Sequence, residues 1–206
     1  IAVPLRLVAA RLGLVRYGRN NVTYAPMVGS YLQLLAYLAD AELPIAPDWK
    51  PVELSLLDEC ATCRACQRLC PTGAIMGERV LLRAERCLTL ANESGGDWPS
   101  WVPASAHHCL LGCLQCQRFC PANPDLPIAR SGVTLTGEQT AALLAGGDRH
   151  ATSQTGILAT LERLGLSDPE TAVIGRNLRA MLQARPARRG ACDSAECRPR
   201  GAIASR

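Results

Sequence analysis

The sequence reads CATCRACQRLCP from Cys60 to Pro71, a C-x2-C-x2-C-x3-C-P run. A second run, C-x2-C-x3-C-P, extends from Cys113 to Pro121. Thiolates are the usual ligands of iron–sulfur clusters, and this spacing is that of bacterial two-cluster ferredoxins. In that pattern three closely spaced cysteines hold one cube, and the fourth, ahead of the proline, reaches the other cube. The two runs therefore predict two [4Fe–4S] clusters with crossed ligation.

Crossed ligation divides the cysteines into two sets. The first cube would be held by Cys60, Cys63, Cys66 and the crossing Cys120. The second cube would be held by Cys113, Cys116, the crossing Cys70 and a fourth thiol. A complete second run would have that thiol at position 110, which is Leu110. Cys87 and Cys109 are the two candidates, and the spacing alone does not choose between them.

Two other uses of cysteine compete with clusters. A structural zinc site more often has two C-x2–4-C pairs than a triplet followed by C-P. A disulfide framework is typical of small secreted chains, and nothing in the sequence looks like a secretory signal. The spacing therefore favours iron–sulfur clusters over both.

The composition is otherwise that of an ordinary globular protein. The chain has 206 residues, 48% hydrophobic content, 11 cysteines and a net charge of +4. Nearly all of the positive charge is arginine, because Lys50 is the only lysine. No apolar run approaches the roughly 20 residues of a membrane span. We expect a cytoplasmic monomer without membrane contact, and the initial isoleucine suggests a chain cut from a longer one.

Residues 1–56 predict a helix, a turn and a strand ahead of the first cysteine run. Leu5–Val15 has apolar residues at helical spacing. Tyr17–Asn21 is a polar turn whose residues tolerate positive φ, and Val22–Tyr24 favours a strand. Tyr31–Leu43 fits a helix by composition and a strand by alternation, so both interpretations stay open.

Residues 57–130 form the predicted cluster domain, with a short strand at Val80–Leu82. Residues 131–184 predict three helices. The first is Thr136–Gly146, with Thr136 and Gln139 as a capping box, and the second is Gln154–Leu164. The third runs from a start signal at Ser167 to about Gln183. These helices form either a cap on the cluster domain or a single helical repeat.

Residues 185–206 are basic and predicted to be disordered, with contacts to RNA as the alternative. Two thiols alone do not make a metal site, so Cys192 and Cys197 are treated as free. No ligand role is assigned to the histidines, which are His107, His108 and His150.

Several of these features occur in a characteristic order. A Gly-Arg-Asn-Asn turn at 18–21 precedes Gly29-Ser30, the first run continues into Thr72-Gly73-Ala74-Ile75, and Arg86-Cys87-Leu88 lies between the two runs. In this order the sequence resembles the epoxyqueuosine reductases, cobalamin-dependent iron–sulfur enzymes that are related to the corrinoid reductive dehalogenases. The resemblance covers roughly residues 1–130.

The resemblance implies a function. In this family, electrons from an external low-potential donor pass through two cubes to a corrinoid, whose reduced cobalt acts on an epoxide in a tRNA base. A lone cysteine between the two runs ligates the second cluster, which points to Cys87 and leaves Cys109 spare. Contacts to the corrinoid would then come from Gly18, Arg19 and Asn20.

The chain departs from the family in three respects. Most of the corrinoid-binding domain, including an acidic residue proposed as proton donor, would lie before residue 1, so no catalytic residue is assigned. The family's turn is commonly Gly-Lys-Asn-Thr after a Gly-Trp pair, whereas this chain has Arg19 and Asn21 and lacks the tryptophan. The C-terminal helical region is also short.

The residues and the resemblance together predict an α+β fold. A ferredoxin-like two-cluster domain would be attached to part of a corrinoid-binding α/β domain, with a short C-terminal helical region. The predicted function is the electron-transfer part of a cobalamin-dependent oxidoreductase of the epoxyqueuosine reductase type, which acts in queuosine biosynthesis. Two alternatives stay open: a stand-alone two-cluster electron carrier, and a corrinoid reductase that acts on a small molecule.

Overall fold

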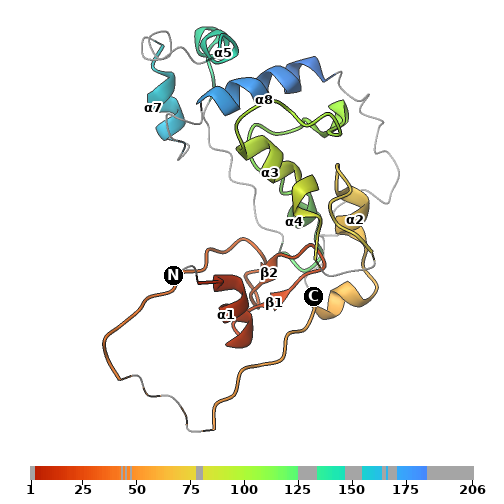
Figure 1. Ribbon diagram of the computed structural model, residues 1–206, viewed down its shortest axis with the longest axis vertical. Helices are drawn as coiled ribbons and strands as arrows, with labels where there is room; N and C mark the ends of the chain where they lie inside the picture. The colour runs from red at the N-terminus through yellow and green to blue at the C-terminus, as the bar shows by residue number, and fades with distance from the viewer. Residues whose placement is uncertain are drawn as a thin grey trace, which may run out of the picture.

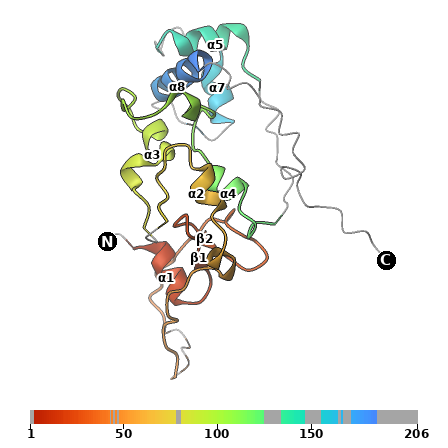
Figure 2. The same cartoon turned by 90° about the vertical axis from the view of Figure 1, so that its right-hand side faces the viewer.

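The computed structural model is elongated, with three parts arranged along its long axis (Figure 1). A strand hairpin with one helix lies at one end, the cysteine-bearing helices lie in the middle, and the C-terminal helices lie at the other end (Figure 2). The structure describes residues 3–42, 44, 46, 48–77, 81–124, 134–146, 155–163, 166 and 171–184. The basic tail with Cys192 and Cys197, together with His150, lies outside the described residues.

The first helix, α1, spans Leu5–Arg11 and is shorter than the predicted Leu5–Val15. It ends early because Gly13 adopts a φ of +77°, a left-handed conformation that terminates helices. The buried residues Ala9 and Ala10 form a small core with Val15, and Leu32 packs against it. The helix therefore lies against the hairpin that follows it.

The hairpin consists of β1, Arg16–Tyr17, and β2, Thr23–Tyr24, which pair antiparallel. The strand expected at Val22–Tyr24 is confirmed over its last two residues. The Gly18 N–H closes the turn by donating to the Val22 carbonyl at 2.7 Å. The Leu57 N–H donates to the Tyr17 carbonyl at 2.9 Å, so the hairpin is attached to the start of the cysteine-bearing segment.

The stretch Tyr31–Leu43 forms neither the helix nor the strand expected of it over its described residues, 31–42. It runs as an extended loop (Figure 1). Leu32 and Leu34 pack against the small core of α1, whereas Tyr37 and Leu38 are almost fully exposed. Both sequence interpretations were wrong because an alternating apolar pattern becomes a strand only where a partner pairs with it.

The middle part consists of short helical segments. They are η1 (Asp58–Ala61), α2 (Ala65–Leu69), η2 (Ala84–Arg86), α3 (Leu88–Glu93), η3 (Ala104–Ala106) and α4 (Gln115–Arg118). Helices α2 and α4 pack side by side (Figure 2). Leu81 and Leu82 form no strand, and Val80 lies outside the described residues. In the described ranges β1–β2 is the only sheet, so the fold is helix-rich, and the ferredoxin-like and α/β architectures stay predictions.

The C-terminal part contains α5 (Gly137–Leu144), α7 (Ile157–Glu162) and α8 (Thr171–Gln183). The predicted capping box on α5 is confirmed, because the Thr136 side chain accepts from the Gln139 N–H at 3.2 Å and Gln139 Oε1 accepts from the Thr136 N–H at 3.0 Å. The predicted starts of the other two helices, Gln154 and Ser167, lie outside the described residues.

A second core joins the C-terminal helices to the middle of the molecule. Its buried members are Leu143, Ile157, Leu161 and Ile174, and Leu110 and Leu111 pack against them. Helix α8 also contacts α3 and η3. A Cβ at Gly175 would collide with the Leu143 carbonyl, so glycine lets α8 approach α5 closely. The C-terminal helices thus cover one end of the cysteine-bearing part.

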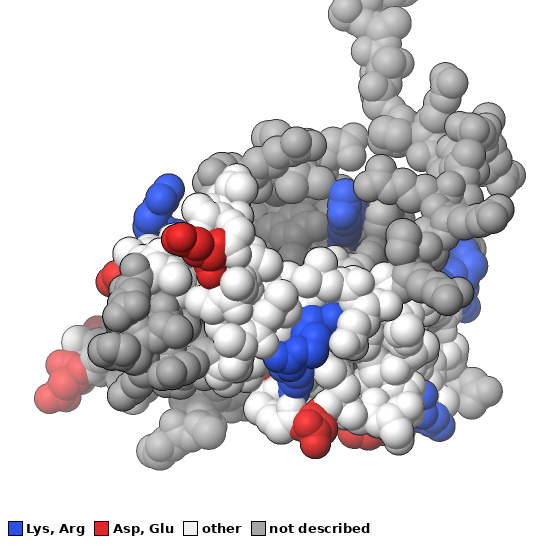
Figure 3. Space-filling model, turned by 90° about the horizontal axis from the view of Figure 1, so that it is seen from above, with Lys and Arg blue, Asp and Glu red and all other residues white. Residues whose placement is uncertain are grey.

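Charged side chains do not gather into one basic surface on the face seen from above. Over its described residues, Lys and Arg side chains lie apart from one another among uncharged ones (Figure 3). None of the helices in the described part of the chain has the length and apolar character that a membrane span needs.

Candidate metal centre

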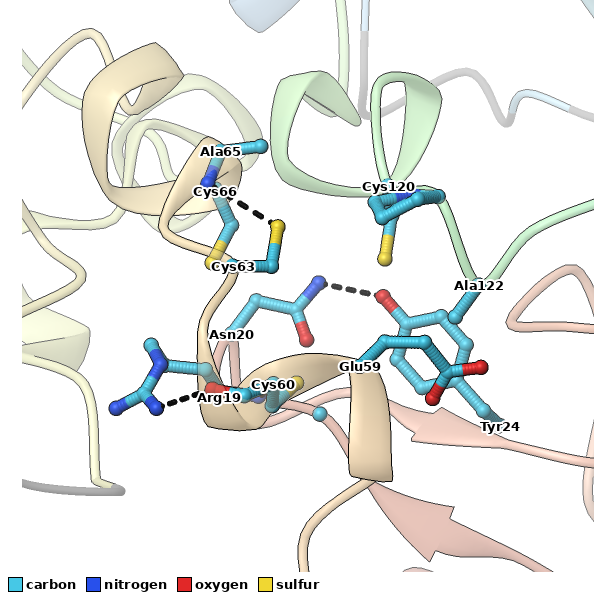
Figure 4. A pocket seen from close by; sticks show the side chains of 12 residues that line it. Arg19, Asn20, Tyr24, Glu59, Cys60, Cys63, Ala65, Cys66, Cys120 and Ala122 are labelled. Carbon is cyan, nitrogen blue, oxygen red and sulfur yellow. Dashed lines mark hydrogen bonds between the residues drawn. The ribbon is translucent and has the colours of Figure 1, made fainter.

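Four cysteines line a first cavity between the hairpin, η1 and the helices α2 and α4 (Figure 4). Cys60 lies in η1, Cys66 lies in α2, and Cys120 follows α4. With Cys63, these are the four residues that the spacing assigned to the first cube. Burial raises the pKa of the Cys66 thiol, and the neighbouring sulfurs raise it further. Four thiolates this close repel one another unless a positively charged group neutralises them.

Backbone N–H groups point at the sulfurs of this first cavity. The Arg19 N–H donates to Cys60 Sγ at 3.4 Å, and the Ala65 N–H donates to Cys63 Sγ at 3.5 Å. The Arg19 side chain also donates to the Cys60 carbonyl at 2.5 Å. Such donors stabilise negative charge on sulfur, so the cavity is suited to thiolate ligands.

The hairpin closes the first cavity with two buried polar side chains, Asn20 and Tyr24. Asn20 Nδ2 donates to Tyr24 Oη at 2.8 Å and to the Cys116 carbonyl at 3.1 Å. Burial raises the pKa of Tyr24 above its usual range, and the neighbouring Cys120 adds to that rise. Both side chains are therefore fixed against the cysteines.

A second cavity of about 540 Å³ is lined by Cys70, Cys87, Cys113 and Cys116. Burial raises the pKa of Cys113, with contributions from Cys70 and Cys87. Burial also raises the pKa of Cys116 to about 12. The neighbours that add to this rise include Cys66, a member of the first set, so the two cavities adjoin.

Helices α2 and α4 each have one cysteine in the helix and one just after it, and these two cysteines line different cavities. Cys66 in α2 faces the first cavity and Cys70, just after α2, faces the second. Cys116 in α4 faces the second cavity and Cys120, just after α4, faces the first. This is the arrangement that crossed ligation requires.

Hydrogen-bond donors in the turn after α2 favour the thiolate form of Cys70. Burial alone would raise its pKa, but the backbone N–H groups of Thr72, Ile75 and Ala74 and the Thr72 hydroxyl outweigh burial and lower the pKa. The Ala74 N–H lies 3.2 Å from Cys70 Sγ. A thiol with a lowered pKa is more readily deprotonated and bound to a metal.

Cys109 lies apart from the cavity lining and is engaged elsewhere. Its Sγ donates to the Gly112 carbonyl at 2.6 Å, and Asn92 Nδ2 donates to the same sulfur at 3.5 Å. Burial raises the pKa of Cys109 to about 11. Cys87, by contrast, faces the second cavity at the start of α3.

The two described histidines have different surroundings. His108 Nδ1 lies 2.8 Å from the Ala106 carbonyl, and its Nε2 lies 3.3 Å from the Cys113 carbonyl and 3.7 Å from Cys113 Sγ. The His107 ring packs edge-on against Trp98. Burial lowers the pKa of His107, and Arg176 and His108 add to that effect.

Helix α8 holds the loop that leads to Cys113. Asn177, which is 1% exposed, donates through Nδ2 to the carbonyls of Asn92 and Leu110, both at 2.6 Å. Asn92 in turn donates to the Gly112 carbonyl at 2.6 Å. Arg176 donates to the Ala91 carbonyl at 2.9 Å and lies over the Trp98 ring. The second cavity is thus supported from the C-terminal side.

The donor sets fit clusters better than single metal ions or disulfides. In the described ranges no three His, Cys, Asp or Glu side chains converge closely enough to hold one metal ion. The nine described cysteines are all free thiols, so the disulfide framework is contradicted for them. Each cavity instead has four sulfurs distributed around a space, as a cube with cysteine at each iron needs.

The structure adds three residues to the predicted site, and the corrinoid contacts stay a prediction. Gly18, Arg19 and Asn20, expected at the corrinoid, line the first cavity, and Asn20 lines the second as well. Sequence reasoning missed Tyr24, Asn92 and Asn177 as parts of the site. Tyr24 was recognisable only as a strand residue, and no sequence signal distinguishes a buried asparagine from an exposed one.

Comparisons with known proteins agree with this arrangement. Residues 59–123 match the family described as a 4Fe-4S double cluster binding domain. The chain is 32% identical over 133 residues to epoxyqueuosine reductase of Staphylococcus aureus. This alignment covers 65% of this chain and 33% of the relative. It is 34% identical over 119 residues to the Escherichia coli epoxyqueuosine reductase, in an alignment that covers 57% of this chain and 29% of the relative.

Solved structures of similar fold carry the same name. Epoxyqueuosine reductase from Streptococcus thermophilus superposes with a TM-score of 0.57 at 23% identity, covering 89% of this chain and 46% of that one. The Bacillus subtilis enzyme superposes with a TM-score of 0.55 at 25% identity, covering 86% and 45%. The predicted resemblance to epoxyqueuosine reductases is confirmed. The chain spans about a third of the length of the Staphylococcus aureus relative.

Proposed function

We propose that this chain is the iron–sulfur electron-transfer part of a cobalamin-dependent reductase of the epoxyqueuosine reductase type. The observation that carries the proposal is the division of eight cysteines between two adjoining cavities, with α2 and α4 each contributing to both. When bound, the clusters would supply low-potential one-electron chemistry and the corrinoid would supply a reactive cobalt centre.

The proposed ligands of the first cluster are Cys60, Cys63, Cys66 and Cys120, and those of the second are Cys70, Cys87, Cys113 and Cys116. Cys87 is preferred over Cys109 because Cys87 lines the second cavity. Cys109 instead donates its thiol proton to a backbone carbonyl. Asn20 links the two sites, because it donates to Tyr24, which lines the first cavity, and to the carbonyl of Cys116, a ligand of the second set.

Space for a larger cofactor adjoins the second cavity. A neighbouring hollow of about 800 Å³ shares Arg6, Asn21, Val22 and Gln117 with that cavity. Apolar side chains of α1 and of the loop after the hairpin, including Leu7 and Leu32, line this hollow. Polar side chains, including Gln33 and Ser30, line the same hollow, so it offers partners to both the ring and the peripheral amides of a corrinoid. This continuity supports the cobalamin part of the proposal.

The proposed substrate is the epoxyqueuosine base of a tRNA. The support is the name shared by the relatives, and one similar structure is that of epoxyqueuosine reductase with an epoxyqueuosine-modified tRNA stem loop. An external low-potential electron carrier would be the donor. The role of the chain itself is to hold the clusters, exclude water from them and place them beside the cofactor.

An anaerobic absorbance titration of the full-length protein with cobalamin tests this proposal. Saturable binding with a changed cobalt spectrum supports the corrinoid enzyme. No binding with both clusters intact would contradict it and favour a two-cluster carrier. Bound cobalamin without activity on epoxyqueuosine-containing tRNA would instead indicate a small-molecule substrate.

A further inference from the structure

Tyr24 is a buried residue of the hairpin that contacts a proposed cluster ligand. Its side chain is 3% exposed and lines the first cavity. Its hydroxyl points toward the sulfur of Cys120, which lines the same cavity (Figure 4). Tyr24 lies outside residues 59–123, which match the two-cluster family, so the family pattern does not account for it.

The hydrogen bond that the Tyr24 hydroxyl makes with Asn20 leaves its own proton free. Asn20 Nδ2 donates to Tyr24 Oη at 2.8 Å, so the phenol oxygen is the acceptor in that contact. A tyrosine hydroxyl has one proton of its own to donate. With Asn20 occupying a lone pair, that proton is available to the Cys120 sulfur.

Asn20 is itself held in one orientation. Its Oδ1 accepts from the Val22 N–H at 3.2 Å, and its Nδ2 also donates to the Cys116 carbonyl at 3.1 Å. Gly18 leaves room for this pair, because a Cβ there would lie 2.6 Å from Tyr24 Cε2 and from Asn20 Oδ1. The contact between Tyr24 and Cys120 is therefore built into the hairpin.

We propose that Tyr24 tunes the first cluster by donating a hydrogen bond to the Cys120 sulfur, which raises the reduction potential of that cluster. Reduction adds negative charge that spreads over the sulfurs, and a fixed donor stabilises the reduced form more than the oxidised one. Hydrogen bonds to cluster sulfurs are one of the main determinants of cluster potential. The inference rests on the proposed function, since it requires a cluster in the first cavity.

The test compares Tyr24→Phe with wild type, both as the full chain with clusters assembled anaerobically. Tyr17→Phe is the matched control, because Tyr17 lies in the same hairpin and does not line either cysteine cavity. A redox titration followed by electron paramagnetic resonance gives both midpoint potentials. In Tyr24→Phe one midpoint should fall, so that the ratio of reduced to oxidised cluster at fixed potential drops about tenfold, or about 59 mV. The other midpoint, and both midpoints of Tyr17→Phe, should not move.

A second readout identifies the hydrogen bond itself. Electron–nuclear double resonance in H2O and D2O should show an exchangeable proton coupled to the reduced first cluster of wild type and of Tyr17→Phe. That coupling should be absent from Tyr24→Phe. Unchanged midpoints with an unchanged set of couplings would overturn the inference.

Iron content measured on the same samples separates this inference from the proposed function. About eight irons per chain in wild type are required by the two clusters, and their absence would contradict the proposed function. Eight irons with unmoved midpoints in Tyr24→Phe would contradict the tuning role alone. Loss of four irons in Tyr24→Phe would show that the hydroxyl holds the cluster in place, and this would also overturn the tuning role.

Discussion

The two cysteine cavities are built from the same motif but are supported by opposite ends of the chain. At the first cavity, the N-terminal hairpin supplies Arg19, Asn20 and Tyr24. At the second, the C-terminal helix α8 holds the ligand loop through Asn177 and Asn92. The repeated motif therefore provides the sulfurs, whereas segments outside it provide the surroundings that distinguish one cluster from the other.

The supports also differ in kind. The hairpin brings polar atoms to the sulfurs themselves: the Arg19 N–H donates to Cys60 Sγ, and the Tyr24 hydroxyl faces the Cys120 sulfur (Figure 4). Helix α8 instead fixes backbone carbonyls of the loop, and none of the described α8 residues lines the second cavity. We infer that the hairpin sets the electronic properties of the first cluster, whereas α8 sets the mechanical stability of the second.

The largest expected effect is the loss of one cluster on removing Cys87. Cys87→Ala takes a proposed ligand from the second cavity, so iron should fall from about eight to about four per chain. Cys109→Ala is the matched control and should keep both clusters, because that thiol bonds to the Gly112 carbonyl. Iron and sulfide analysis of anaerobic samples distinguishes the two variants. Loss of a cluster in Cys109→Ala, with both clusters kept in Cys87→Ala, would overturn the ligand assignment.

A smaller effect is expected from removing the buried amide of α8. Asn177→Leu leaves the carbonyls of Asn92 and Leu110 without their donor. Each unsatisfied buried group costs about 1–3 kcal/mol, so the free energy of unfolding should fall by about 2–6 kcal/mol for the two carbonyls. Urea unfolding under anaerobic conditions measures this loss.

The control for Asn177→Leu is Gln183→Leu, which removes an exposed amide from the same helix. It should change stability by less than about 0.5 kcal/mol. At intermediate urea, Asn177→Leu should release the second cluster before the first. Release of the first cluster ahead of the second would contradict the division of roles between the hairpin and α8.

The smallest of the three effects is expected at Gly18. A Cβ there meets Asn20 and Tyr24, so Gly18→Ala forces a buried pair to move. Overpacking of this kind costs about 1–3 kcal/mol. It should lower occupancy of the first cluster more than that of the second, because Tyr24 lines the first cavity alone. Gly95→Ala is the control: it adds a Cβ in open space and should change the occupancy of neither cluster. A spectroscopic measurement of cluster content compares the two variants. Equal loss of both clusters in Gly18→Ala would contradict a hairpin that supports mainly the first cluster.

Some of this arrangement could be predicted from local sequence. The cysteine spacing predicted which seven thiols would lie together in two groups, and these groups line the two cavities, because the motif itself determines how α2 and α4 present them. Their role as cluster ligands stays a prediction. The capping box at Thr136 was predicted because both partners lie within one turn. Such features depend on neighbours in sequence and little else.

Other parts depended on contacts between distant residues. Spacing could not choose between Cys87 and Cys109, because the difference lies in what surrounds each sulfur. The bond from Asn177 to the Asn92 carbonyl joins residues 85 positions apart. Tyr31–Leu43 carried an ambiguous pattern that no described partner resolves into a helix or a strand.

The most direct test of the central claim is the iron, sulfide and zinc content of the anaerobically prepared chain. Two cubes predict about eight irons and eight inorganic sulfides per chain, and little zinc. About one or two zincs with no sulfide would contradict the account, because the eight cysteines would then hold single ions instead of clusters.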